Sequence, residues 1–132
     1  MKTLLEALIG SHNIKNASNY QIIKKKDDLR MGDLCMQRDG QIGVYVEDID
    51  LSKFNIHSKD DKTILFLKAG QGMSWQHYPV KYLSVGLKDI DGESEFDMIK
   101  VVRVNLKPQV CKDPDLLYKF LSDERNYAKY FE

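Results

Sequence analysis

The sequence predicts an α+β domain that is mainly β: a small SH3-like barrel, or a strongly bent antiparallel sheet, with N- and C-terminal helices. The chain has 132 residues, which is the usual size of one domain. Short runs rich in β-branched and aromatic residues, separated by Gly and Asp turns, lie between residues 20 and 104. Apolar residues at helical spacing lie near both ends. We expect a single domain over residues 1–132, with a helix over 2–10, a β core over 20–104 and a helical segment over 113–131.

The predicted N-terminal helix has one apolar face, and Gly10 can end it. The residues of that face are Leu4, Leu5, Leu8 and Ile9. A helix of about three turns must dock on the rest of the domain to persist. A loop rich in Asn and Ser follows, and residues 20–24 then predict a first short strand.

The clearest strand signal is a hairpin centred on Asp39-Gly40. This pair favours a two-residue type I′ turn, and it joins two runs over residues 34–38 and 41–46. Apolar side chains alternate along both runs, as they do in a half-buried pair of strands. Those side chains are Leu34, Met36, Ile42, Val44 and Val46. Gly43 indicates either a bulge or a close approach of another backbone.

Two further runs predict strands, over residues 62–68 and 96–104, and residues 82–87 are compatible with a single helical turn. Asp113-Pro114 reads as an N-cap followed by proline at the first helical position. The apolar face of that helix comprises Leu116, Leu117, Phe120 and Leu121. Three aromatic residues suggest that the C-terminal tail packs on the domain: Tyr127, Tyr130 and Phe131.

Composition restricts the classes of function. Lys+Arg and Asp+Glu both number 20, so the net charge is zero, which argues against a protein that lives mainly on phosphate contacts. No segment approaches the roughly 20 apolar residues of a membrane span, and Glu6 interrupts the short apolar run that a signal peptide would need. We therefore expect a cytoplasmic protein with two free thiols, Cys35 and Cys111.

Residue patterns that would indicate catalysis are missing from the sequence. The histidines, His12, His57 and His77, have no second ligand at a metal-binding spacing. Cys35 lies on a predicted strand, away from any helix N-terminus that would lower its pKa. Gly32-Asp33-Leu34 with residues 41–46 resembles a stretch of the NlpC/P60 peptidases, but Gln41 stands where that family has its catalytic histidine. We expect no enzymatic activity, no metal and no cofactor.

A basic patch is one candidate binding site. Its residues are Lys24, Lys25, Lys26, Arg30 and Arg38. Small β-barrels can bind nucleic acid by pairing such a patch with exposed aromatic rings, and Tyr45 is one candidate ring. Aspartates at 27, 28, 33 and 39 lie among these cations and weaken their field. A solvated surface of mixed charge explains the same pattern.

A second candidate is the segment that follows Gly70-Gln71-Gly72. It carries Trp75, Gln76, His77 and Tyr78, and such aromatic residues are enriched in binding hot spots. The alternative is that Trp75 and Tyr78 are core residues and that the glycines only turn the chain. The sequence leaves both interpretations open.

The strand and turn motifs resemble a family of small uncharacterised proteins from phages and prophages. The resemblance rests on Gly32-Asp33, on Asp39-Gly40, and on residues 89–101, where a D-I-D-G turn leads to E-F-D-M-I-K-V. In the family a GD-type strand and a DG hairpin lead to a final strand of the form D-I-V-K-V. The match covers about half of the chain. It implies a phage origin and a small β-barrel, and it supplies no functional residues.

These observations lead to three hypotheses of function. The first is a non-enzymatic phage-type binding protein that inhibits a host defence effector, such as a CRISPR nuclease, by occlusion in the cytoplasm of an infected bacterium. The second is a sponge for a cyclic nucleotide or an ADP-ribose-type immune signal, with a base stacked on Trp75, Tyr78 or Tyr45 and phosphates on residues 24–30. The third is an accessory nucleic-acid-binding protein, whose affinity would fall steeply with salt.

Overall fold

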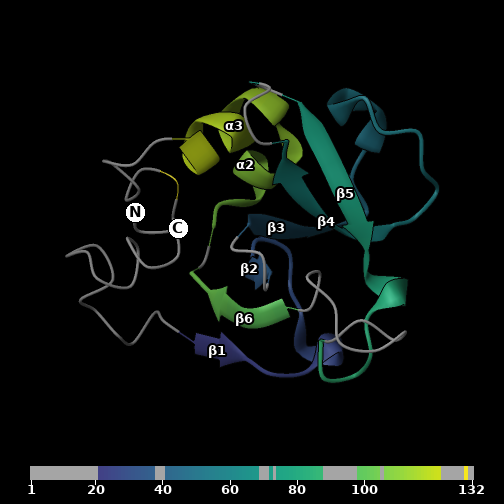
Figure 1. The fold of residues 1–132 in the computed structure, drawn as a ribbon. Helices are drawn as coiled ribbons and strands as arrows, with labels where there is room; N and C mark the ends of the chain where they lie inside the picture. The colour runs from purple at the N-terminus through teal and green to yellow at the C-terminus, as the bar shows by residue number, and fades with distance from the viewer. Residues whose placement is uncertain are drawn as a thin grey trace.

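A twisted antiparallel sheet is the centre of the structure, a computed structural model that describes residues 21–37, 41–68, 72, 74–87, 98–104, 106–122 and 130 (Figure 1). Within these residues, six strands follow the order β1-β6-β2-β3-β4-β5. The strands are β1 (Gln21–Ile23), β2 (Leu34–Gln37), β3 (Ile42–Glu47), β4 (Lys62–Leu67), β5 (Trp75–Pro79) and β6 (Met98–Arg103). The 3-10 helices are η3 (Lys26–Asp28), η4 (Leu51–Phe54) and η5 (Val80–Tyr82), and the α-helices are α2 (Pro108–Lys112) and α3 (Pro114–Ser122). The fold is therefore α+β and mainly β.

The predicted N-terminal helix and the predicted barrel closure are not seen among the described residues. The predicted helix over residues 2–10 lies outside the described residues. β1 and β5 stand at the two edges of the sheet, and no pairing between described strands joins them into a closed barrel. The described strands thus form an antiparallel sheet whose order differs from the chain order at one place, where β6 lies between β1 and β2.

The predicted hairpin is present as β2 and β3. Leu34 pairs with Val44 and Met36 with Ile42, in the register that the alternation of apolar residues favours. The turn residues 38–40 lie outside the described residues. A Cβ atom added at Gly43 would lie 2.6 Å from the carbonyl oxygen of Leu65 on β4, so the close-approach interpretation of this glycine is correct.

The sheet is buried on both faces, so the prediction of a half-buried strand pair is wrong. On one face, side chains such as Leu34 and Val44 pack with Leu117 and Phe120 of α3. On the other face, a second cluster is centred on Tyr45. This second cluster contains Ile23, Leu29, Cys35, Tyr45, Ile64, Phe66, Val80, Leu83, Leu87 and Val101. Val80 of η5 and Leu83 and Leu87 of residues 82–87, the segment that the sequence left ambiguous, supply apolar cover for this second face.

Two short helices follow β6 and cover the first face of the sheet (Figure 1). α3 begins at Pro114 as predicted, because the Asp113 carboxylate accepts a hydrogen bond from the Asp115 backbone N–H at 2.9 Å. α2, which begins at Pro108, was not predicted. Tyr130 packs edge-to-face on Phe120 with ring centroids 5.3 Å apart, so this part of the tail does pack on the domain.

Candidate binding site

Trp75, the centre of the predicted aromatic loop, is a core residue. It begins β5 opposite Leu67 and is only 9% exposed. Its ring meets Phe54 edge-to-face, with centroids 5.0 Å apart. Of the two interpretations that the sequence left open, the core one holds for Trp75. Its indole N–H is buried and has no hydrogen-bond partner among the described residues.

The three residues that follow Trp75 are half-buried on the edge strand β5. The Gln76 side chain donates a 2.9 Å hydrogen bond to the side-chain oxygen of Gln41. Tyr78 packs against the second core and meets Tyr82 edge-to-face, with centroids 6.0 Å apart. His77 pairs with Leu65 in the strand register. These three side chains are thus only partly accessible to a binding partner, and they lie on a strand rather than on an exposed loop.

Tyr45 is also unsuited to stacking on a ligand. Its ring belongs to the second core, and its hydroxyl donates a 2.9 Å hydrogen bond to a carboxylate oxygen of Glu47. Burial, and then this hydrogen bond and the charge of Glu47, raise the pKa of Tyr45 well above its ordinary value. The ring is therefore neutral and enclosed in the folded protein.

The predicted basic residues separate into two groups. Lys24, Lys25 and Arg30 are exposed and make no ion pair with any described residue. Lys26 is half-buried: its ammonium donates a 2.9 Å hydrogen bond to the Leu83 carbonyl, and its backbone N–H donates to the Val85 carbonyl at 2.8 Å. Lys26 therefore attaches η3 to the segment that covers the second core. Arg38 lies outside the described residues.

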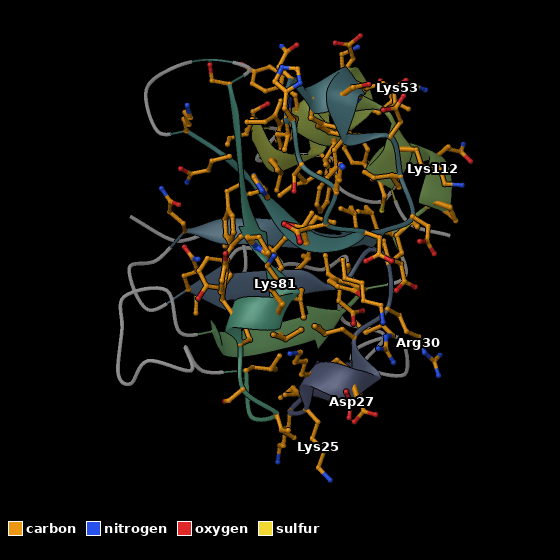
Figure 2. All side chains as sticks on the ribbon, turned by 90° about the vertical axis from the view of Figure 1, so that its right-hand side faces the viewer. Lys25, Asp27, Arg30, Lys53, Lys81 and Lys112 are labelled. Carbon is orange, nitrogen blue, oxygen red and sulfur yellow. The ribbon has the colours of Figure 1, made fainter. Side chains whose placement is uncertain are left out.

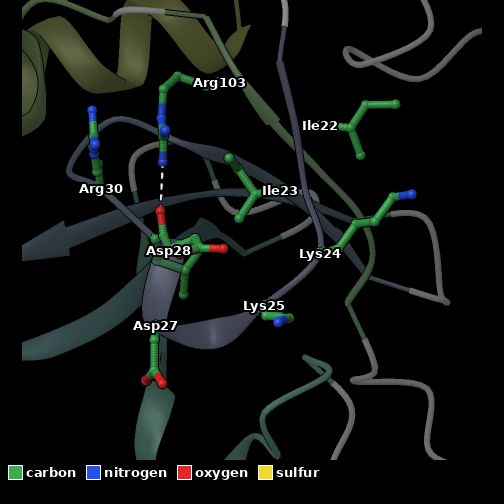
Figure 3. Close-up of a pocket in the computed structure, with 9 residues that line it drawn as sticks. Ile22, Ile23, Lys24, Lys25, Asp27, Asp28, Arg30 and Arg103 are labelled. Atoms are coloured by element: carbon green, nitrogen blue, oxygen red, sulfur yellow. Dashed lines mark hydrogen bonds between the residues drawn. The ribbon is translucent and has the colours of Figure 1, made fainter.

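Lys24, Lys25 and Arg30 are among the residues that line a pocket between β1 and η3 (Figure 3). Its volume is about 450 Å³. It is lined by Ile22, Ile23, Lys24, Lys25, Asp27, Asp28, Leu29, Arg30 and Arg103. The charge run that the sequence placed on a solvated surface thus forms one wall of a concavity, with isoleucine side chains from β1 beside it.

Arg103 is the member of this pocket that sequence reasoning missed. It ends β6, and its guanidinium makes two 3.0 Å hydrogen bonds to the carboxylate of Asp33, which is 1% exposed. It also donates to the Asp28 carbonyl, the contact drawn in Figure 3. The Arg30 backbone N–H donates to the same carboxylate at 2.9 Å. These contacts of the Arg103–Asp33 ion pair therefore fix the C-terminal end of η3 and the turn that follows it.

Neither cysteine has the surroundings of a nucleophile. Cys35 is buried, its Sγ lies 3.8 Å from the Asp33 carbonyl oxygen as a weak donor, and burial followed by the charge of Asp33 raises its pKa well above the ordinary value. Burial also raises the pKa of Cys111 to about 12. Both thiols are free. At neutral pH both are protonated and enclosed.

The described residues also expose large apolar side chains. These are Ile22 at 47%, Tyr82 at 47% and Val85 at 64%. Lys81, next to Tyr82, forms a 3.0 Å ion pair with Asp60, and its ammonium lies 5.4 Å from the centre of the Tyr82 ring. Tyr82 and Val85 lie on the segment that leaves the edge strand β5.

Comparison of the chain with protein-family models, with curated proteins and with solved structures found no match. In the part of the chain that the structure describes, no group of three or more His, Cys, Asp or Glu side chains is arranged to hold a metal ion. Within the same residues, none of the helices has the length and apolar character needed to cross a membrane.

Proposed function

We propose that this chain is a non-enzymatic binding protein of phage type that inhibits a host defence effector, such as a CRISPR nuclease, by covering part of its surface. It would act in the cytoplasm of the infected bacterium. The observation that carries the proposal is the exposure of Tyr82 and Val85 on a backbone segment that is held in place. Exposed apolar side chains that are grouped on a surface are typical of protein interfaces.

The backbone around Tyr82 and Val85 is attached at several points. The Leu83 N–H donates to the Val80 carbonyl at 2.9 Å, and the Leu87 N–H donates to the Ser84 carbonyl at 2.9 Å. Leu83 and Leu87 are themselves buried in the second core. Because the segment is ordered before binding, association would lose little conformational freedom there, and this favours affinity.

The chemistry of the segment suggests what the partner surface would offer. Tyrosine is enriched among the residues that dominate binding energy. Lys81 is exposed beside Tyr82, although Asp60 already pairs with it. An effector surface with an apolar pocket for Tyr82 and Val85 and an acidic rim would be complementary.

The proposed phage origin and the proposed kind of partner are supported by the sequence rather than by the Tyr82–Val85 surface. They rest on the resemblance of Gly32-Asp33, Asp39-Gly40 and residues 89–101 to small phage proteins, and the small β-barrel that this resemblance implies is part of the same proposal. A nucleic-acid-binding role has less support, because Trp75 and Tyr45 are buried and cannot stack on bases.

The test is complex formation with purified candidate effectors, measured by size-exclusion chromatography. We expect the wild-type chain to co-elute with its effector and Val85→Asp to weaken the complex at least tenfold. Gln109→Asp is the matched control, because it introduces the same side chain at an exposed position on α2, at the opposite end of the molecule (Figure 1). Absence of a complex with every effector tested, or equal loss in both variants, would contradict the proposal.

A further inference from the structure

We propose that the pocket between β1 and η3 binds a small phosphate-bearing molecule with a ring or other apolar portion, of the size of a mononucleotide. None of its lining residues belongs to the Tyr82–Val85 surface, although the Lys26 backbone N–H of η3 donates to the Val85 carbonyl at 2.8 Å, and the inference does not depend on the function proposed above. Its volume of about 450 Å³ falls in the range of small-molecule sites, which runs from roughly 300 to 1,000 Å³.

The charge of the lining favours an anion of low charge. Lys24, Lys25, Arg30 and Arg103 contribute four cationic side chains against the carboxylates of Asp27 and Asp28. Asp33, behind the pocket, neutralises Arg103 through their ion pair. One positive charge remains in excess, which suits one phosphate group better than a long polyanion.

Arg30 is the best-placed group for a phosphate. Its backbone N–H donates to the Asp33 carboxylate, whereas its exposed side chain makes no hydrogen bond or ion pair with any described residue. An arginine whose backbone is fixed and whose side chain is free can meet two phosphate oxygens at once. Lys25 lines the same pocket and is exposed and unpaired among the described residues; in Figure 2 its side chain extends in another direction than that of Arg30, so it would contact another part of the ligand.

Arg103 acts as a positioning residue in this site. Its guanidinium bonds to Asp33 and to the Asp28 carbonyl, and it therefore holds η3 at a set distance from the end of β6. In Figure 3 its side chain reaches from β6 toward Asp28, while the Asp27 carboxylate points away from Ile23 and Arg103. These contacts within the protein hold the lining of the pocket in place, so binding does not require its assembly.

The apolar part of the lining defines the rest of the ligand. Ile22, which is 47% exposed, and Ile23 stand beside the cations on β1, and Leu29 follows η3. Inorganic phosphate would leave Ile22 uncovered, whereas a nucleoside or similar ring would cover it and add apolar contact. We therefore expect nucleoside phosphates to bind more tightly than phosphate alone, and uncharged nucleosides to bind weakly.

Isothermal titration and thermal shift of the full chain with phosphate, adenosine, AMP, cyclic AMP and ADP-ribose test this inference. We expect a nucleotide to bind and to raise the melting temperature, and Arg30→Ala and Lys25→Ala to weaken its binding at least tenfold. Lys53→Ala and Lys112→Ala are matched controls, because both lysines are exposed and lie away from the pocket (Figure 2).

Three outcomes would overturn the inference. The first is no heat and no shift with any probe at about 1 mM, the weak end of specific binding. The second is equal loss of binding in the pocket variants and the control variants, which would place the site elsewhere. The third is stronger binding of oligonucleotides than of mononucleotides with a steep dependence on salt, which would indicate a nucleic-acid surface instead. Since Arg30 and Lys25 are exposed, circular dichroism should show that their variants fold normally.

Discussion

Replacing Gly43 by alanine should destabilise the protein strongly, although the change adds only one methyl group. The new Cβ would lie 2.6 Å from both the Leu65 carbonyl oxygen and Phe66 Cε1, and 2.7 Å from Ile64 Cγ2, whereas ordinary contact begins near 3.4 Å. The Leu65 oxygen belongs to the backbone of β4, so it cannot rotate away, and β3 and β4 must move apart. Overpacking of a core costs about 1–3 kcal/mol, and we expect the upper end of this range here.

Gly86→Ala is the matched control for this substitution. Nothing lies within 4 Å of a Cβ added at Gly86, and its backbone does not have a positive φ. Alanine there should be neutral or should stabilise the protein by about 0.4–1 kcal/mol, through the lower entropy of the unfolded chain. The two variants should therefore change stability in opposite directions.

Thermal and urea unfolding measure the difference between the two variants. For a chain of this size, each 1 kcal/mol shifts the melting temperature by about 4 °C, so Gly43→Ala should melt roughly 10 °C below the wild type. A melting temperature of Gly43→Ala within about 2 °C of that of Gly86→Ala would refute the reasoning. It would mean that the contact between β3 and β4 relaxes without cost.

Three further predictions concern the buried groups. Asp33→Asn should lower the free energy of unfolding by about 3–5 kcal/mol, because it leaves Arg103, only 12% exposed, without its counter-ion. In chemical denaturation, the double variant with Arg103→Gln should lose less stability than the sum of the two single variants. Strictly additive losses would argue against the coupling of the two residues. Burial raises the pKa of Cys111 from about 9 in the unfolded chain to about 12, so the folded state keeps its proton longer. The contribution of Cys111 to stability is fully present below pH 9 and decreases by about 1.4 kcal/mol per pH unit as the pH rises toward 12. In urea unfolding measured across this range, Cys111→Ala should lessen the fall of the unfolding free energy with pH. An unchanged pH dependence would contradict the prediction. Trp75, being buried, should fluoresce to the blue of free tryptophan and shift to the red on unfolding, and a native spectrum like that of exposed indole would place it outside the core.

Part of the candidate site could be predicted from the sequence. The cluster of Lys24, Lys25 and Arg30 is local in the chain, so composition alone identified it. Arg103 could not be found in this way, because it is separated from Asp33 by 70 residues and they meet only when β6 inserts between β1 and β2. The only sequence signal for Arg103 is that a charged residue stands at the end of an apolar strand, and this signal does not identify Asp33 as its partner.

The sequence also could not show whether Trp75, in the aromatic segment over residues 75–78, is exposed for binding or buried. Trp75 follows a glycine-rich stretch of the sequence, and a ring in that position can face either solvent or a core. The pairing of β5 with β4 decides the matter, because it turns Trp75 toward Phe54. An exposed ring, Tyr82, and an exposed apolar side chain, Val85, lie instead in residues 82–87, which the sequence analysis described only as compatible with a single helical turn.

Local features of this protein could be read from the sequence: the β2–β3 hairpin and its register, the start of α3 at Pro114 and the basic run near η3. Each depends on residues that are neighbours in the chain or on the preference of one residue type. Only the folded chain shows that the sheet is buried on both faces, that Trp75 and Tyr45 are core residues, that β4 leaves no room for a side chain at position 43, and that the basic run lines a pocket together with Arg103. These features depend on contacts between distant segments, whose free energy no local pattern records.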